Sequence, residues 1–297
     1  MNNIELTIFT PAYNRAHTLA RLYQSLLSQT LKNFEWLIID DGSVDETEPL
    51  VQGFIQQRLI PIRYIKQKNA GKQAAWNNAV IAAKGQLFCG VDSDDALASP
   101  HNIEDIFNKY KHLLNDKKII GLRFLAYSNV KQTFDGQKLS DQVVICSYFD
   151  EFSNPKNFGE RIDVLKTALL KQYLYPVSLN TKFIPEIWFY VQVSNAGYQF
   201  AYIPEALRLF FDEATDNRLS RSSVLKHAEG HYISRSAMLK YIPMSVYSKN
   251  MMALVKTLIR FGQCANYLNK SFQQRSQDSN AMYALISYLS KFIKSGT

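Results

Sequence analysis

Four short polar clusters follow apolar runs in the first hundred residues, and each contains side chains that could bind a ligand. Their sequences are Thr10-Pro11-Ala12-Tyr13-Asn14-Arg15, Asp40-Asp41-Gly42-Ser43, Asn69-Ala70-Gly71-Lys72 and Asp92-Ser93-Asp94-Asp95. Taken singly, each cluster is as typical of an ordinary turn or helix cap as of a binding site. Four such clusters at the same edge of one sheet would be much harder to explain by turn chemistry alone.

Five aspartates in these clusters could bring several carboxylates together. They are Asp40, Asp41, Asp92, Asp94 and Asp95. Two like charges about 4 Å apart repel by roughly 1 kcal/mol in water and by about 4 kcal/mol at an effective dielectric constant near 20. Such a site would repel a phosphate unless a divalent cation intervened, and oxygen ligands at this spacing suit Mg²⁺ or Mn²⁺. Lys72, at the start of a helix, adds a cation and free backbone N–H groups. These residues predict metal-assisted binding of a nucleotide diphosphate.

Alternating apolar runs and helical periods predict the elements that position these clusters. We expect strands at Leu6–Thr10, Phe34–Ile39, Ile62–Lys66 and Gln86–Val91. Between them we expect a helix over Leu19–Leu27, a helix that opens with a capping box of Ser43 and Glu46, and a helix over Lys72–Ala83. Strands that alternate with helices form parallel β-α-β units, which bind ligands beyond the carboxyl ends of their strands.

After Asp95 the alternation weakens. We expect helices near Asn102–Leu114, Arg161–Leu170 and Pro185–Asn195, strands at Ile119–Tyr127, Val143–Tyr148, Phe200–Ile203 and Ala206–Phe211, and a turn at Phe134-Asp135-Gly136. From about Ser220 onward the pattern is helical. Near the end, apolar residues recur at helical spacing and would share one face of a helix that does not include Ser287. These residues are Ala281, Ala284, Leu285, Tyr288, Leu289, Phe292 and Ile293.

Composition and charge divide the chain in two. Of its 297 residues 46% are hydrophobic, which is enough for a globular core and excludes a disordered chain or a small disulfide scaffold. The net charge of +8 is unevenly distributed: residues 1–216 hold 22 Lys and Arg against 24 Asp and Glu, whereas residues 217–297 hold 12 against 2. We therefore expect a near-neutral domain over residues 1–216 and a basic, amphipathic helical region over residues 217–297.

The expected location is the cytoplasm. Cys89, Cys146 and Cys264 are far apart and lack the spacing of metal ligands, so we expect buried thiols in a reducing compartment. Residues 1–5 lack the basic and apolar pattern of a secretion signal, and no run of 18 apolar residues occurs. His227 and His231 are four residues apart, but no third zinc ligand lies near them in the sequence, so solvated or packing histidines are expected.

In their order and spacing, the clusters resemble the family 2 glycosyltransferases, which are inverting enzymes with the GT-A nucleotide-sugar-binding fold. The matching residues are Thr10–Asn14, Ile39–Asp45, Asn69, Gly71, Ala75, Asn77, Gly85 and Val91–Asp95. The resemblance covers about the first 100 residues. It implies an α/β fold, Rossmann-like, with a mostly parallel sheet and helices on both faces, followed by the C-terminal helical region.

The resemblance also implies roles for individual residues. Pro11, Tyr13 and Asp41 would line the nucleobase pocket, with Asp41 accepting a hydrogen bond from N3–H of uracil or thymine. Asp92 would approach the ribose, and Asp94 would hold a Mn²⁺ or Mg²⁺ ion that neutralises the diphosphate, a role that Asp95 could take instead. The remaining nucleotide-binding residues are Ala12, Asn14, Lys72, Asn77 and Ser93.

A further part of the resemblance lies in the second half of the chain. Gly197-Tyr198 and Ile203-Pro204-Glu205 match the end of a family motif, and eleven residues before Gly197 stands Glu186. Glu186 therefore looks like the general base that takes the acceptor's hydroxyl proton, a contribution of typically ~10²–10⁴ in rate.

Two positions depart from the family pattern. Pro185-Glu186 replaces the usual Glu-Asp pair, and Trp76 stands where many relatives have Arg, so that Lys72 is expected to supply the missing charge. A subgroup associated with bacterial surface polysaccharides is similar at Gly159-Glu160-Arg161, at residues 182–186 and at Leu219-Ser220, which favours Pro-Glu as a functional variant.

We therefore expect a metal-dependent, inverting transferase that moves a hexosyl or N-acetylhexosaminyl group from a nucleotide diphosphate, preferably a UDP-sugar. Its acceptor would be a hydroxyl of a glycan or of a lipid-linked molecule in polysaccharide or capsule biosynthesis. The alternatives are a nucleotide-sugar-binding protein without activity and a metal-dependent nucleotidyltransferase. A nucleotidyltransferase would need a glycine-rich phosphate loop after the first strand, and Thr10–Arg15 contains no glycine.

The basic helical region has three interpretations: a solvated face, a nucleic-acid patch or a membrane-surface element. Nucleic acid is not expected as a partner, because the basic residues are dispersed and no nucleic-acid-binding motif accompanies them. Helices with Lys and Arg beside Tyr, Phe, Met and Leu are typical of attachment to anionic lipid. We therefore expect a protein that can associate peripherally with the inner face of the plasma membrane.

Overall fold

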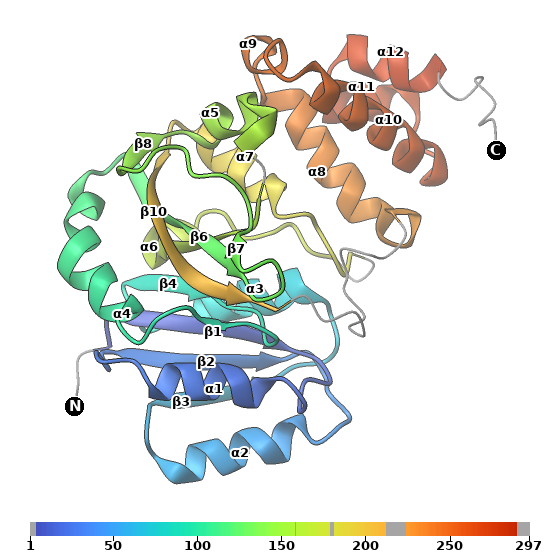
Figure 1. Cartoon of the computed structure of the whole chain (residues 1–297). Coiled ribbons are helices and arrows are strands. Elements are labelled where there is room, and N and C mark those ends of the chain that lie inside the picture. Colours follow the sequence, from blue (N-terminus) through green and yellow to red (C-terminus); the bar gives the residue numbers. More distant parts are fainter. Residues whose placement is uncertain (1–3, 158, 179–180, 212–223, 290–297) are drawn as a thin grey trace. The chain divides into compact units, whose positions relative to one another are not determined.

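The computed structural model describes residues 4–157, 159–178, 181–211 and 224–289 (Figure 1). Contacts divide the chain into two compact units. The first contains Met1–Cys146, Lys156–Leu174 and Tyr198–Ala214, and the second contains Ser147–Pro155, Tyr175–Gly197 and Thr215–Thr297. The expected domain boundary at residue 216, and Leu219-Ser220, lie outside the described residues.

The first unit is built on one sheet, whose strand order is β3-β2-β1-β4-β9-β6-β10-β5. Its first four strands are parallel: β1 (Leu6–Ala12), β2 (Phe34–Asp40), β3 (Ile62–Lys66) and β4 (Leu87–Gly90). They are joined by α1 (Leu19–Leu27), α2 (Thr47–Gln57) and α3 (Lys72–Ala82). These seven elements confirm the expected β-α-β alternation.

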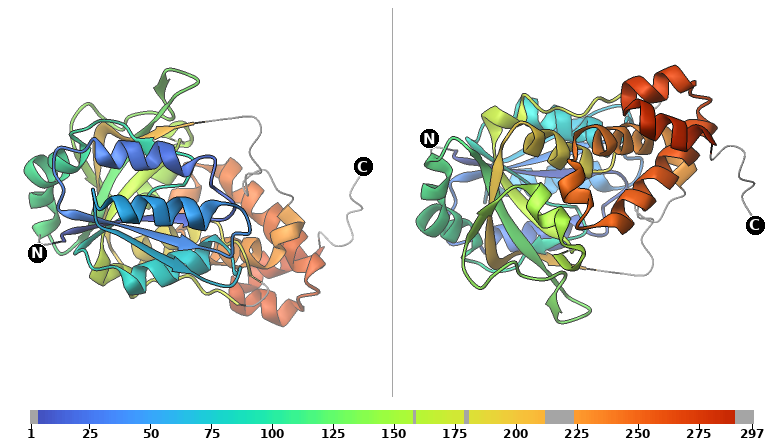
Figure 2. Two further views of the ribbon diagram at one scale, coloured as in Figure 1. Left: turned by 90° about the horizontal axis from the view of Figure 1, so that it is seen from below. Right: turned by 90° about the horizontal axis from the view of Figure 1, so that it is seen from above.

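Strand order places the helices on both faces of the sheet. The chain steps from β1 to β2 and β3 in one direction and then crosses to β4 on the far side of β1. Right-handed crossovers therefore put α1 and α2 on one face and α3 on the other, as Figure 2 shows. Leu6 and Ile8 of β1 share a core with the buried side of α1, whereas Phe9 packs edge-on against Trp76 of α3 at 5.9 Å.

The second half of the sheet is mixed, not mostly parallel. It contains β5 (Ala96–Leu97), β6 (Ile119–Ser128), β7 (Thr133–Phe134), β8 (Val144–Cys146), β9 (Arg161–Lys166) and β10 (Gln199–Phe210). Only β6 and β10 pair in parallel there; the other described pairings are antiparallel. Residues 102–115 form one helical stretch, which begins as α4 (Asn102–Asp105) and continues as a π turn and a 3₁₀ turn.

Three expectations for the first unit are wrong in detail. Arg161–Lys166 is a strand between β4 and β6, and only α6 (Thr167–Leu170) of the expected helix is helical. Residues 161–164 alternate in burial, with Ile162 and Val164 buried. The pairing of residues 161–166 with β4 and β6 determines the structure here, although the spacing of apolar residues in the sequence is also compatible with a helix. The two strands expected over residues 200–211 are a single strand with register shifts, and Phe134 pairs with β6 instead of forming a turn.

The capping box expected at the start of α2 is absent. The helix begins at Thr47, and Glu46 in the capping position makes no side-chain cap. The Ser43 hydroxyl instead accepts a hydrogen bond from the backbone N–H of Asn14 at 2.9 Å. Ser43 therefore joins the loops after β1 and β2, and does not cap a helix.

The second unit is helical. Its elements are α5 (Tyr148–Ser153), α7 (Ile187–Asn195), a 3₁₀ turn (Val224–His227), α8 (Ala228–Tyr241), α9 (Met244–Tyr247), α10 (Met251–Tyr267), α11 (Phe272–Asp278) and α12 (Ala281–Leu289). Helix α8 packs against α7 and α10, and α12 packs against α10 and α11. Within the described residues no helix has both the length and the apolar character needed to cross a bilayer.

The stripe expected on the last helix is confirmed only in part: Ala284 is buried and Tyr288 is half-buried, but Ala281 and Leu285 are exposed. Phe292 and Ile293 of that stripe lie outside the described residues. The buried residues of α12 include Tyr283, Ala284 and Ser287, whereas Leu285 is 51% exposed. The side of α12 that carries Ser287 faces Arg275 of α11, which is fully buried and donates a 3.0 Å hydrogen bond to the backbone oxygen of Ser287. Of the three free thiols, those of Cys89 and Cys264 are buried, whereas Cys146 is half-buried.

A close backbone approach at Gly85 gives a stability prediction. A Cβ at this position would lie 2.5 Å from the backbone nitrogen of Thr7 and 2.6 Å from the carbonyl carbon of Leu6. Because backbone of β1 must move to relieve the overlap, we expect Gly85→Ala to lower the free energy of unfolding by about 2 kcal/mol or more.

The matched control is Gly53→Ala, in the middle of α2, where an added Cβ meets nothing within 4 Å. Replacing a helical glycine with alanine should raise stability by about 0.5–1 kcal/mol. Urea unfolding of both variants measures the two effects. Equal stability of the two variants would contradict the packing at Gly85.

Candidate nucleotide and metal site

The loops after β1 and β2 are tied together by polar contacts. Asn14 adopts a left-handed conformation, with φ of 54°, and its side-chain oxygen accepts from the N–H of Val44 at 3.0 Å. The next two backbone N–H groups bond to the Thr47 hydroxyl at 2.9 Å and to the Asp45 carboxylate at 3.2 Å. The first and second clusters therefore form one rigid wall at the carboxyl end of the sheet.

Asp41 organises the third cluster. Its carboxylate accepts hydrogen bonds at 2.8 Å from the backbone N–H groups of Ala70 and Gly71 and from the side chain of Gln67. Within the described residues Oδ2 accepts the Gly71 bond alone, so it keeps a lone pair for a ligand donor. Asp40 is fully buried, and its oxygens bond to the Ser43 N–H and the Tyr64 hydroxyl. Asp40 therefore holds the turn and does not face a ligand.

The fourth cluster brings three carboxylates together. Asp92, Asp94 and Asp95 follow β4, and each offers an oxygen that lies within 4.8 Å of the other two. Asp92 and Asp94 are partly exposed, whereas Asp95 is 2% exposed. Within the described part of the chain this is the only group of three acidic, histidine or cysteine side chains with that proximity.

Two cations compensate this charge. Lys72, the first residue of α3, places its ammonium 2.9 Å from Asp92. Arg208 of β10 lies 3.4 Å from Asp95 and 3.9 Å from Asp92, and its other terminal nitrogen donates to Glu160 at 2.7 Å. Residues more than a hundred positions apart in the sequence therefore meet at one point.

The balance of burial and charge separates the pKa values of the acids. Burial raises the pKa of Asp92, but Lys72 and Arg208 outweigh it and hold that pKa below its ordinary value. Burial raises the pKa of Asp95 to about 7; Asp92 and Asp94 add to the rise, and Arg208 opposes it. The pKa of the buried Arg208 is raised by Asp95, Glu160 and Asp92 against the effect of burial, so the guanidinium stays charged.

Arg208 and Glu160 were missed as charge partners from the sequence alone. The signal for Arg208 is its position in the strand Gln199–Phe210, where it is 7% exposed among apolar neighbours. A charged group in a buried strand requires a partner of opposite charge. That rule could have identified the arginine, though not which acids it meets.

The other predicted nucleotide-binding residues lie at or just after the ends of β1 and β4, except Asn77, which lies within α3. Tyr13 is 50% exposed and Pro11 is half-buried, so both present surface at the end of β1. Ala12, Asn77 and Ser93 are buried, and Ala12 contributes its carbonyl oxygen to the N–H of Asp41 at 2.8 Å.

Trp76 belongs to the apolar packing of α3. Its ring meets Phe88 edge-on at 5.1 Å, and a Cβ on Gly90 would lie 2.8 Å from it. The aromatic ring at this position therefore fills the core beside β4. Lys72 and Arg208, and not a residue at position 76, compensate the negative charge of the aspartates after β4.

Glu186 lies in the second unit. Its side chain is exposed, and it occupies the position before the first residue of α7, which is Ile187. Its backbone oxygen accepts from the N–H of Phe189 at 2.9 Å. The helix ends at Asn195, and Gly197 follows with φ of 86°. The expected spacing of the motif on a helix is thus confirmed, whereas the role of Glu186 stays a prediction.

His227 and His231 both pack edge-on against the ring of Phe183. Their rings lie 5.6 and 5.9 Å from that of Phe183. Burial lowers the pKa of His231 to about 4, with Arg235 and His227 adding to the effect. The sequence predicts solvated or packing histidines, and both rings pack against Phe183.

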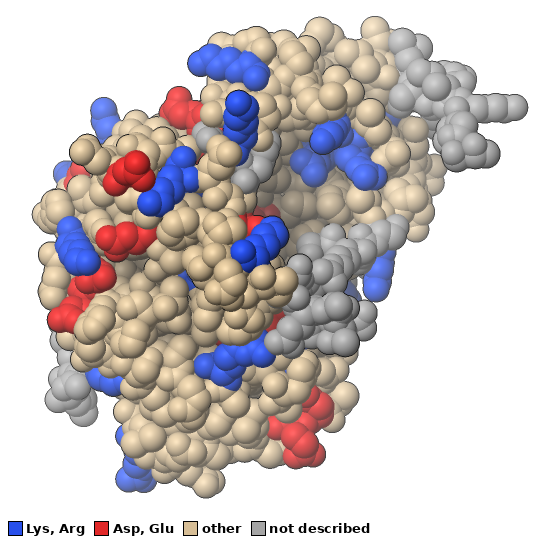
Figure 3. Space-filling view, in the orientation of Figure 1, with Lys and Arg blue, Asp and Glu red and all other residues tan. Residues whose placement is uncertain are grey.

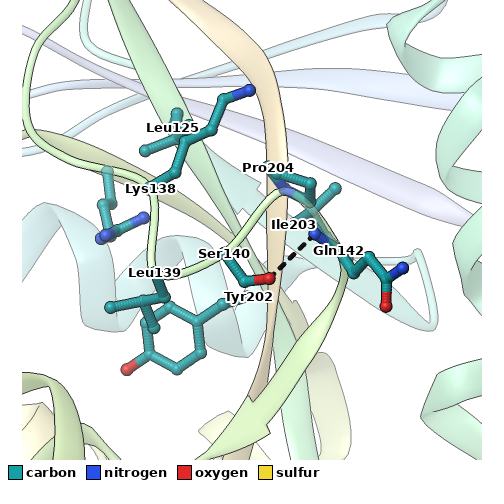
Figure 4. A pocket seen from close by; sticks show the side chains of 9 residues that line it. Leu125, Lys138, Leu139, Ser140, Gln142, Tyr202, Ile203 and Pro204 are labelled. Atoms are coloured by element: carbon teal, nitrogen blue, oxygen red, sulfur yellow. Dashed lines mark hydrogen bonds between the residues drawn. The ribbon is translucent and has the colours of Figure 1, made fainter.

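A small hollow elsewhere in the first unit does not coincide with the site. It lies beneath the loop of Lys138–Gln142, against Leu125 and Tyr202, and its empty space is about 170 Å³ even with open solvent included (Figure 4). Ser140 accepts a hydrogen bond from the N–H of Gln142 at 3.1 Å there. Ligand pockets usually enclose about 300 Å³ or more, so this hollow is too small for a nucleotide sugar.

The fold and the acidic turn after β4 define the class of the protein: an α/β glycosyltransferase of the GT-A type. The chain matches the family model described as Glycosyl transferase family 2 over residues 7–205, and it belongs to that family.

Curated relatives agree with this assignment, and solved structures share the fold. The UDP-Glc:alpha-D-GlcNAc-diphosphoundecaprenol beta-1,3-glucosyltransferase of Escherichia coli is 31% identical over 42% of this chain and 53% of its own length. S. aureus TarS in complex with UDP-GlcNAc has a TM-score of 0.63 at 16% identity, with 92% of this chain and 75% of that chain covered. The mannosyltransferase PcManGT from Pyrobaculum calidifontis, in complex with GDP-Man and Mn²⁺, has a TM-score of 0.56 at 12% identity, over 99% and 88%. The first curated relatives are longer proteins, of which this chain spans 15% to 51%.

The buried Arg208 gives a prediction with a pH signature. Because the pKa of Asp95 is raised in the folded protein, ionisation of Asp95 favours unfolding as the pH rises through about 7, and Arg208 limits that cost. We expect Arg208→Gln to lower the free energy of unfolding by about 3 kcal/mol at about pH 8, because the ionised carboxylate of Asp95 then lacks its cationic partner. The loss should be smaller near about pH 5, where Asp95 is protonated.

Urea unfolding at the two pH values measures this difference. Lys109→Gln is the control, because it removes a lysine whose partner is Asp105 and whose side chain is 53% exposed. That variant should change stability by less than about 1 kcal/mol at either pH. A loss that is independent of pH in Arg208→Gln would contradict the pairing with Asp95.

Proposed function

We propose that this protein is an inverting glycosyltransferase that moves a sugar from a nucleotide diphosphate to a hydroxyl group. The observation that carries the proposal is the cluster of Asp92, Asp94 and Asp95 beside Lys72 and Arg208, in a chain of this family. A set of carboxylates that Lys72 and Arg208 compensate only in part suits a ligand that brings its own phosphates together with a divalent ion.

The carboxylates fit a metal. Mn²⁺ and Mg²⁺ prefer oxygen ligands and usually take one or two carboxylates, with substrate phosphates completing the shell. Asp94 is the first candidate ligand, because its carboxylate is partly exposed and close to that of Asp92. Asp95 is the second, although its oxygens already meet Arg208 and the N–H of Phe211 at 3.3 Å. A bound ion would neutralise charge on the departing nucleoside diphosphate.

The chain's own residues would orient the donor. Pro11 and Tyr13 would contact the base, and Oδ2 of Asp41 would accept its N3–H, for which the carboxylate retains a lone pair. Lys72 would exchange part of its contact with Asp92 for a phosphate, while Asp92 would approach the ribose. The remaining nucleotide contacts are assigned to Ala12, Asn14, Asn77 and Ser93.

Glu186 would act as the general base. It would accept the proton of the acceptor hydroxyl as that oxygen attacks the anomeric carbon from the face opposite the diphosphate, which inverts the centre. Its exposed carboxylate at the start of α7 supports this role. The alternative of a nucleotide-sugar-binding protein without activity would rest on Pro185, which replaces the usual acid before this position.

The donor and acceptor are proposed by class. A UDP-hexose or UDP-N-acetylhexosamine is favoured, since the Escherichia coli relative is named for UDP-Glc and the TarS structure contains UDP-GlcNAc. The acceptor would be a glycan or a lipid-linked molecule in polysaccharide or capsule biosynthesis. We place the reaction at the cytoplasmic face of a membrane, with the transferase domain over residues 1–216 and the basic region beyond it as a peripheral attachment. No nucleic acid is proposed as a partner.

The direct test is a panel of nucleotide sugars with Mn²⁺ or Mg²⁺ and lipid-linked or soluble glycan acceptors, with released nucleoside diphosphate as the readout. We expect release with one or a few UDP-sugars. Released pyrophosphate instead of nucleoside diphosphate would identify a nucleotidyltransferase. Binding of a UDP-sugar without turnover, on acceptors that related transferases use, would favour the inactive binding protein.

The base is tested by Glu186→Gln, which should lower kcat by about 10²-fold or more and leave the affinity for the donor within about twofold. Glu46→Gln is the matched control, because Glu46 is also an exposed acid in the position before a helix, and it should turn over normally. Normal turnover in Glu186→Gln would rule out the assignment.

A further inference from the structure

The second unit carries an apolar and basic face on two adjacent helices. Helix α10 exposes Met251, Met252, Val255, Ile259 and Tyr267, and α12 exposes Met282, Leu285 and Ile286; these eight side chains are 45% to 63% exposed. They are eight of the 18 large hydrophobic side chains that are exposed in the described part of the chain. Since α10 packs beside α12, the apolar surface is concentrated on neighbouring helices. We call these eight residues the α10–α12 face.

The apolar residues of α10 occupy one sector of its exposed side. Met251, Val255 and Ile259 recur every four residues, and Met252 lies beside them, at spacings that place all four on one side of a helix. The opposite side is buried by Leu254, Thr257 and Phe261. The helix therefore has two apolar sides, one that packs inside the unit and one that the structure leaves exposed.

Cations border this exposed sector. Lys256 and Arg260 lie next to it on α10, and Lys249 precedes the helix; all three are exposed. Neither α10 nor α12 contains an Asp or a Glu, and the sole acid of residues 244–289, Asp278, accepts a 2.7 Å hydrogen bond from Tyr232. On the side drawn in Figure 3, the region of α10–α12 shows blue and tan side chains and no red ones.

We infer that the α10–α12 face docks on the surface of an anionic lipid bilayer. Exposed Met, Val, Ile and Leu side chains can enter the boundary between headgroups and acyl chains, while Lys and Arg beside them meet the negative headgroups. The charge argues against a second copy of the chain as the occupant, because two such faces would bring their cations together. The 17 residues of α10 are too few and too interrupted by charge for a span, so the helix lies along the surface.

The inference deepens the proposed function by naming the surface that would bring the transferase to a membrane-borne acceptor. Its test requires no donor, acceptor or turnover. A negative result therefore leaves the transfer reaction open, and an inactive enzyme can still dock.

The experiment is co-sedimentation of the full chain with two kinds of vesicle, phosphatidylcholine alone and equal parts phosphatidylcholine and phosphatidylglycerol. We expect binding to the mixed vesicles, weakened at high salt, and much less to the neutral ones. The double variant Lys256→Gln, Arg260→Gln should bind about 25-fold more weakly, which corresponds to roughly a fivefold loss for each cation. The triple variant Met252→Ser, Val255→Ser, Ile259→Ser should lose binding by about tenfold or more.

Matched variants in the first unit control for general effects. Leu59→Ser, Ile81→Ser and Val130→Ser together remove a similar exposed apolar area, since these side chains are 59% to 64% exposed. Lys117→Gln with Lys118→Gln removes two exposed cations. Both controls should bind like the wild type, and thermal unfolding should confirm that every variant is folded.

Two outcomes overturn the inference. The first is an absence of binding to the mixed vesicles, or an equal loss in the matched controls. The second is a protein that does not bind vesicles but forms a dimer in sedimentation equilibrium, with the triple apolar variant a monomer. In that case the face joins two copies of the chain.

Discussion

The repulsion among the carboxylates after β4 is the constraint on which the site depends. Three acids whose oxygens approach within 4.8 Å stay together because Lys72 and Arg208 supply positive charge from α3 and β10. Neither cation is adjacent to the acids in sequence, so the compensation exists only when the mixed sheet is complete. The β9 strand matters for this reason: it joins the parallel half of the sheet to β6 and β10, and thereby brings Arg208 to the end of β4.

The rest of the edge is organised around buried acids that serve the backbone. Asp41 binds two N–H groups of the loop before α3, and Asp40 and Asp45 bind those of the turns beside it. Loops held in this way lose little conformational entropy when a ligand binds. The loops of this site are therefore held in place before a ligand binds, and part of the negative charge of its carboxylates is not compensated. Such a site is suited to a phosphate-containing donor that arrives with a divalent cation.

The first hundred residues could be predicted from sequence because their signals are local. Strand, turn and helix follow one another within the range of hydrophobic periodicity, and strands β1 to β4 begin and end within about two residues of expectation. The strand at Arg161–Lys166 and the burial of Ser287 could not be predicted, since each is in contact with a separate part of the chain: the strand with the edges of β4 and β6, and Ser287 with the buried Arg275. The same holds for Arg208, whose importance arises from acids more than a hundred residues away.

We propose that the carboxylates at the end of β4 bind a nucleoside diphosphate together with a divalent ion. The sharpest test is isothermal titration of UDP into the full chain, once with Mn²⁺ and once with EDTA. We expect the ion to strengthen binding by more than about tenfold, given the repulsion that a diphosphate otherwise meets. Asp94→Asn should remove most of that gain. Equal affinity with and without the ion, or a gain that Asp94→Asn leaves unchanged, would contradict the account.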